Sequence, residues 1–156
     1  LYAYVEHGGQ LVVLLNRVGK DSTLFGAYGY GDNGLAVEFA DAAVNGDIHN
    51  YQTALGGAPT GPLTGTWEPD RRTVDPADVL PGSTRGPSLL DAFEGMEAGG
   101  DWTLFVADLH RGGAAQVESW AVELTTTAQV IPEPAWWSSL VALLALGFVL
   151  RKRLVG

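Results

Sequence analysis

The sequence predicts an all-β fold, an antiparallel jelly-roll β-sandwich, followed by one C-terminal transmembrane helix. Short apolar stretches, several of them alternating with polar residues, are separated by turns rich in Gly, Asn, Asp and Pro. Glycine makes up 21 of the 156 residues, which fits many tight turns. No segment of the body shows a convincing long helical pattern, whereas residues 135–150 form one uncharged apolar run.

The first half of the body opens with two strong strands. Residues 1–7 alternate, with Leu1, Ala3 and Val5 on one face. Residues 10–16 (QLVVLLN) contain a continuous apolar run, as expected of a strand buried on both faces. Further strands are predicted over 22–28 and 35–41, a short extended piece over 64–70 and a helical turn over 88–98.

Between residues 46 and 87 the pattern dissolves into Gly, Pro, Asp and Thr. We call these residues the central connection. A connection this long inside a compact domain is either functional or structured by its own packing.

Two strands are predicted to close the body, over 101–108 and 116–127, joined by residues 110–115 (HRGGAA). Alternation places Trp102 with Leu104 and Val106, and Trp120 with Val122 and Leu124. We expect both tryptophans on inward faces of neighbouring strands, where large aromatic side chains supply much of the buried surface.

The charge of the chain is concentrated in the body. Arg151, Lys152 and Arg153 against Glu133 give the tail from residue 130 a charge of +2, so a total of −9 leaves −11 for residues 1–129. This acidity argues against binding nucleic acid, and against docking of the body on anionic lipid. It fits an exported soluble domain and equally fits cation binding.

Two further features bound the possibilities. The absence of cysteine excludes disulfides, thiol nucleophiles and zinc–thiolate sites. The chain starts at Leu1 without Met, so we interpret it as a fragment or processed form whose export signal lies upstream, if it has one.

The stretch 99–127 resembles the C-terminal part of the P domain that follows the catalytic domain of proprotein convertases and many bacterial subtilisin-like proteases. That family shows G-x-W-x-L-x-V-x-D, a Gly-rich turn, and a strand with S-W-x-(apolar)-x-(apolar). The matching residues are Gly100, Trp102, Leu104, Val106, Asp108, Ser119, Trp120, Val122 and Leu124. Upstream, His7, Leu11, Leu14 and Gly19 match a second family stretch, which the chain leaves at Gln10 and Arg17–Val18. Residues 39–43 (FADAA) and 87–95 (PSLLDAFEG) resemble two more.

The resemblance covers residues 1–127 and implies a jelly roll that lacks about one N-terminal strand. The missing strand would leave the first strand here with a bare edge, which is an aggregation hazard.

Four aspartates at or near strand-connecting turns are candidate calcium ligands: Asp32, Asp41, Asp47 and Asp108. Some P domains bind calcium through turn carboxylates. Asp at the end of a strand also bonds backbone N–H groups, so turn capping is the alternative. The family's Gly-Asp-x-Gly after Asp108 is RGGAAQ here, which removes one candidate ligand. No other cofactor is predicted.

No pattern supports catalysis, so the chain is predicted not to be an enzyme. Residues 29–34 (GYGDNG) satisfy G-x-G-x-x-G, but a strand follows and not a helix N-terminus. No G-x-S-x-G occurs. His7 is interpreted as a packing or hydrogen-bonding residue at a strand end.

The tail has three parts in order: Pro132, Glu133 and Pro134 within a linker (128–134), an apolar run (135–150), and Arg151, Lys152 and Arg153 within a basic end (151–156). The run would form a helix about 24 Å long, slightly short of a bilayer core of about 30 Å. The positive-inside rule predicts that the basic end lies in the cytoplasm.

This order resembles the PEP-CTERM sorting signal of Gram-negative bacteria that make exopolysaccharide and biofilms. The resemblance implies export, an intermediate tethered in the inner membrane, processing by an exosortase, and a final place at the cell surface or in the extracellular matrix. We interpret the chain as a non-catalytic surface or matrix module, with exopolysaccharide or another surface protein as partner. The alternative is an accessory P domain of a secreted subtilisin-like serine protease whose catalytic domain lies upstream.

Overall fold

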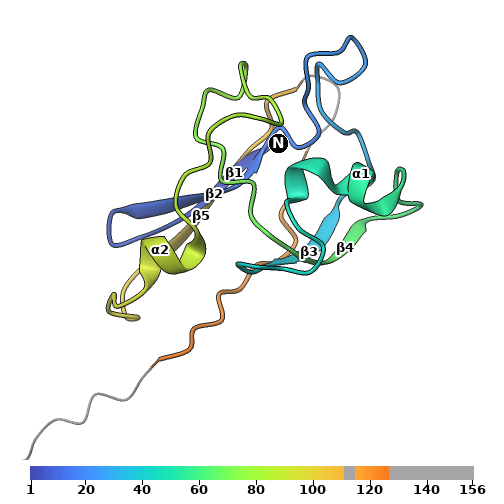
Figure 1. The fold of residues 1–156 in the computed structure, drawn as a ribbon. Coiled ribbons are helices and arrows are strands. Elements are labelled where there is room, and N and C mark those ends of the chain that lie inside the picture. The colour runs from blue at the N-terminus through green and yellow to red at the C-terminus, as the bar shows by residue number, and fades with distance from the viewer. Residues whose placement is uncertain (111–114, 127–156) are drawn as a thin grey trace, which may run out of the picture. The chain divides into compact units, whose positions relative to one another are not determined.

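The computed structural model describes residues 1–110 and 115–126, and Leu1–Leu124 form one compact unit (Figure 1). The described residues are all-β in character, since the helices are single short turns. The strands are β1 (Tyr2–His7), β2 (Gln10–Asn16), β3 (Leu35–Phe39), β4 (Leu63–Trp67) and β5 (Trp102–Ala107). The helical turns are η1 (Ile48–Asn50), α1 (Tyr51–Leu55) and α2 (Leu89–Phe93).

A three-stranded antiparallel sheet has the order β2-β1-β5. The alternation predicted for residues 1–7 is confirmed, because Ala3, Val5 and His7 are buried while the residues between them are partly exposed. The central strand is β1, paired with β2 on one side and β5 on the other. The expectation that β1 has a bare edge is therefore wrong.

A second sheet pairs β3 with β4 in parallel, where the sequence predicted only antiparallel pairing. Parallel neighbours need a long crossover, and residues 40–62 supply one that contains η1 and α1. The sequence pattern does not predict these two helical turns.

The hydrophobic core joins both sheets. It includes Val12 of β2, Leu63 and Trp67 of β4, and Ile48 of η1, each at most 1% exposed. Trp102, Leu104 and Val106 of β5 are partly buried and pack against this cluster, as their alternation predicts. Part of the core thus comes from the central connection, whose sequence shows no regular pattern.

Two predicted strands are absent from the described residues. Residues 22–28 form turns, because the Asp21 carboxylate accepts hydrogen bonds from the backbone N–H (2.7 Å) and hydroxyl (2.6 Å) of Thr23. Leu24 and Phe25 at that turn are 84% and 95% exposed. Residues 115–126 have no regular secondary structure, and Trp120 is 47% exposed. The prediction of Trp120 as an inward-facing core residue is wrong.

The helical turn predicted over 88–98 is confirmed in its first half as α2. A capping box fixes its start: the Ser88 hydroxyl accepts from the backbone N–H of Asp91, whose carboxylate accepts from the N–H of Ser88. Ala92 is buried in the core and Leu89 and Phe93 pack against it, whereas Leu90 is 62% exposed.

Across residues 1–110 and 115–126, no helix has the length and apolarity needed to cross a bilayer. The predicted linker (128–134), transmembrane helix (135–150) and basic tail (151–156) lie outside the described residues.

Candidate functional site

Each of the four candidate calcium ligands is engaged with partners of its own. The Asp41 carboxylate accepts from the backbone N–H groups of Leu89 (3.1 Å) and Leu90 (2.8 Å) at the start of α2. Asp108 accepts from the N–H of His110 at 3.1 Å. Within the described part of the chain, no group of three or more His, Asp or Glu side chains is placed to hold a metal ion.

Asp47 caps η1 and also reaches into a buried polar cluster. Its carboxylate accepts from the N–H of His49 (3.0 Å) and pairs with the Arg72 guanidinium (2.8 Å). The buried polar cluster comprises Asn16, Lys20, Asp47, His49, Asp70 and Arg72.

Asp70 is the centre of the buried polar cluster and is fully buried. Its carboxylate accepts from the backbone N–H of Asn16 (3.1 Å), from His49 Nδ1 (2.8 Å) and from Arg72 (3.0 Å). Three segments far apart in sequence therefore meet on one side chain. A buried carboxylate needs such partners, because desolvation without them is very costly.

Arg72 is almost fully buried, and burial alone lowers a guanidinium pKa. Hydrogen bonds and charges from Asp47 and Asp70 outweigh that effect and hold the pKa of Arg72 above its ordinary value. Arg72 also donates to the carbonyls of Leu80 and Pro81, which fastens the central connection. The buried polar cluster is thus committed to holding the fold.

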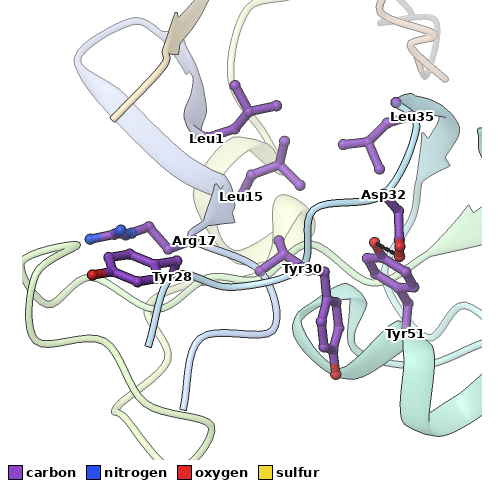
Figure 2. Close-up of a pocket in the computed structure, with 10 residues that line it drawn as sticks. Leu1, Leu15, Arg17, Tyr28, Tyr30, Asp32, Leu35 and Tyr51 are labelled. Atoms are coloured by element: carbon purple, nitrogen blue, oxygen red, sulfur yellow. Dashed lines mark hydrogen bonds between the residues drawn. The ribbon is translucent and has the colours of Figure 1, made fainter. Parts of the chain in front are cut away.

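The groups left for a ligand lie in a recess of about 90 Å³ between β2, β3 and α1 (Figure 2). Figure 2 shows Arg17 and Tyr28 at one end of the recess, and Asp32 and Tyr51 at the other. The lining residues are Leu1, Leu15, Arg17, Val18, Tyr28, Tyr30, Asp32, Gly34, Leu35 and Tyr51.

The Asp32 end of the recess is built by hydrogen bonds. Asp32 Oδ2 accepts from the Tyr51 hydroxyl (2.5 Å) and from Gln52 Nε2 (2.7 Å). Burial, and then Asp32 itself, raises the pKa of Tyr51 far above its ordinary value, so the hydroxyl stays a donor. Asp32 Oδ1 has no hydrogen-bond partner among the described residues and is available as an acceptor.

The opposite end offers donors and an aromatic face. Tyr28 is 67% exposed and packs edge-on against His110, with ring centroids 4.9 Å apart. The side chain of Arg17 has no hydrogen bond or ion pair with the described residues, and its φ of 45° is strained for a non-glycine residue. Strained residues gather at binding sites more often than elsewhere.

The recess suits a small amphiphilic ligand. Its volume is below the 300–1,000 Å³ of ordinary ligand pockets, so it accepts a single ring or the end of a chain. Apolar Leu1, Leu15 and Leu35 line the recess together with the polar residues of its two ends. The sequence did not predict this recess, although Asp32 is one of the candidate turn carboxylates and residues 29–34 match a nucleotide motif without the helix that such a motif needs. Tyr28 and Tyr30 within a Gly-rich turn were the available signal.

Comparison with known proteins identifies no relative: no family model, no curated protein and no solved structure matches the chain.

Proposed function

We propose that the chain is a non-catalytic module of the bacterial cell surface. Its body is a jelly-roll β-sandwich that is exported and tethered in the inner membrane by residues 135–150. An exosortase then processes it near Pro132–Ala135, and the body passes to the cell surface or the exopolysaccharide matrix. The three-part order of the tail carries this proposal.

One feature of the described residues and one feature of the sequence support it. The buried charged groups are used to hold loops together, which suits a stable display domain. In the sequence, Pro132 and Pro134 have no N–H to donate and disfavour a helix, so we expect the backbone there to be accessible to a processing enzyme.

Intact-mass spectrometry tests the sorting step. The chain is expressed with an export signal in a host that contains an exosortase. The surface or medium fraction should then contain a chain that ends near Pro132–Ala135 and lacks residues 136–156. Replacing Arg151, Lys152 and Arg153 with Gln should reduce processing, since the basic end sets orientation. A host without exosortase is the control. Full-length mass in the extracellular fraction of the first host would overturn the proposal.

We further propose that the partner is a matrix saccharide, bound at its end in the recess of Figure 2. The C–H face of a pyranose packs on an aromatic ring such as Tyr28, whose face carries partial negative charge. Its hydroxyls both donate and accept, which matches Asp32 Oδ1 as acceptor and the Arg17 guanidinium as donor.

Affinity electrophoresis through gels containing the host's purified exopolysaccharide tests this partner. The wild-type body should be retarded, while Y28A and D32N should migrate as they do in plain gel. Y4A is the matched control, because Tyr4 is a half-buried tyrosine on β1 outside the recess. Equal retardation of Y28A and Y4A would show that the saccharide does not bind in the recess. It would not affect the proposed sorting step.

The alternative function, an accessory domain of a subtilisin-like protease, rests on the residues that match the P domain in order. Sequencing upstream of Leu1 distinguishes the two. Asp, His and Ser motifs of a subtilisin-like domain favour the alternative, and a signal peptide within a few dozen residues favours the surface module.

A further inference from the structure

His7, the last residue of β1, makes two hydrogen bonds to one connection. This connection, residues 95–101, runs between α2 and β5. His7 Nδ1 lies 2.8 Å from the carbonyl oxygen of Asp101, and Nε2 lies 2.8 Å from that of Glu97. The ring is 5% exposed and stacks on Trp102, with centroids 4.1 Å apart and planes 1° from parallel.

These contacts define the protonation state that the geometry fits. A backbone carbonyl only accepts hydrogen bonds, so each ring nitrogen must donate. A neutral imidazole carries one N–H and can satisfy one of the two carbonyls, whereas the imidazolium satisfies both. Stacking on Trp102 also favours the cation, through the ring's quadrupole.

We propose that His7 is a proton-dependent clamp, which fastens residues 95–101 to the end of β1 as an imidazolium and gives up one anchor when it loses its proton. The proposal concerns a property of the body and is independent of the proposed sorting and saccharide binding.

Residues 95–101 have few other anchors. Their remaining hydrogen bonds in the described chain are Met96 N–H to the Phe93 carbonyl (3.2 Å) and Trp102 Nε1–H to the Ala98 carbonyl (3.2 Å). His7 therefore supplies two of four links, and losing one loosens the connection.

The charged groups around His7 all have the same sign. Glu6 is the neighbour on β1, and residues 94–101 carry Glu94, Glu97 and Asp101. The residues paired with His7, Gln10 on β2 and Trp102 on β5, do not titrate. The hydrogen bonds to Asp101 and Glu97, aided by the charge of Glu6 and opposed by burial, raise the pKa of His7 above its usual value.

The direction of this pKa shift fixes the direction of the pH effect. Because the folded-state pKa is raised, the stabilisation is complete below the unfolded histidine pKa of about 6.5. It is lost as the pH rises through the folded-state pKa. The clamp is thus closed in acid and loosened in alkali.

NMR of the ring nitrogens and amide exchange of the full chain in detergent micelles test the clamp. His7 should keep both N–H protons to a higher pH than an unperturbed histidine, whose pKa is about 6.5, with its resonances assigned through H7Q. Protection factors of amides 95–101 should fall across this titration, by up to about tenfold for each unit by which the pKa is raised. Amides of β4 should show no fall that H7Q removes.

Thermal melting gives a second readout. H7F retains an aromatic ring for stacking but has no donors, so the Tm of wild type minus that of H7F should be largest at about pH 5 and shrink by about pH 9. H110Q should follow wild type. His49 is present in every variant, so its contribution cancels in the difference. A His7 pKa at or below the unperturbed value of about 6.5, or a Tm difference independent of pH, would overturn the proposal.

Discussion

Two regions differ both in sequence pattern and in the burial of their apolar side chains: the central connection (46–87) and the last described segment (115–126). The first has no periodicity, yet it contains Ile48, Trp67 and Val79, each at most 1% exposed. The second alternates like a strand, yet Trp120, Val122 and Leu124 are 38–47% exposed. The difference lies in the partners of the backbone.

In the central connection, charged side chains donate hydrogen bonds to backbone carbonyl groups. Arg72 donates to the carbonyls of Leu80 and Pro81, and Arg85 donates to those of Pro69 (2.8 Å) and Asp70 (3.2 Å). Arg85 is itself held by Glu68 at 3.2 Å. Apolar residues can be buried in an irregular segment when its polar backbone groups are satisfied in this way.

The largest effect is expected from breaking the buried polar cluster. D70A removes the buried carboxylate that His49 and Arg72 share, although Arg72 keeps its ion pair with Asp47, so the free energy of unfolding should fall by about 3–5 kcal/mol. Urea denaturation measures it. The matched control is D75A in the same connection, because exposed Asp75 accepts only from the N–H of Ala77 (2.7 Å). It should cost about 0.5–1.5 kcal/mol. Comparable losses would show that the cluster does not organise this region.

A matched pair of tryptophans tests the two regions directly. W67A removes a side chain that is 1% exposed and should cost about 3–5 kcal/mol. W120A removes one that is 47% exposed and should cost less than about 1 kcal/mol. Urea denaturation followed by fluorescence measures both free energies of unfolding, with the baselines of each variant fitted separately because it lacks one tryptophan. A large loss in W120A would mean that residues 115–126 pack on the body in solution.

Sequence reasoning succeeded where periodicity and burial coincide. Residues 1–7, 10–16 and 101–108 alternate or run apolar, and they form the antiparallel sheet. The reasoning failed at residues 22–28, where Asp21 and Thr23 offered the backbone a local turn in place of a strand partner. It also failed at 116–127, since alternation does not specify which edge a strand will pair with.

The candidate site was less predictable than the sheet. Asp32 was identified as a turn carboxylate, but its contacts with Tyr51 and Gln52 depend on the crossover of residues 40–62. No sequence pattern predicts that crossover. The role of Asp70 depends on bringing residues 16, 49 and 72 together, and no local pattern encodes that.

A smaller effect is expected at α2, whose start is secured in the same way as the central connection. S88A removes the hydroxyl that caps Asp91 and should destabilise the fold by about 1 kcal/mol. S88D, which retains an acceptor, should recover most of that loss. The Ser88 hydroxyl and N–H lower the pKa of Asp91. The stability that Asp91 contributes is therefore lost as the pH falls through its folded-state pKa. The Tm of S88A should accordingly decrease less than the Tm of wild type as the pH is lowered.

The smallest effect is expected from divalent cations, and it follows from the same comparison. If carboxylates in this fold serve to hold backbone N–H groups, then Asp41 and Asp108 are already satisfied. Asp32 and Asp47 are engaged with Tyr51, Gln52 and Arg72. Millimolar calcium and millimolar magnesium should then give the same Tm. An ion bound to the folded state at ten times its dissociation constant would add about 1.4 kcal/mol, which melting detects as several degrees. A calcium-specific rise of that size, abolished by D41N or D108N, would show instead that these loops converge on an ion, and would support the calcium-site hypothesis.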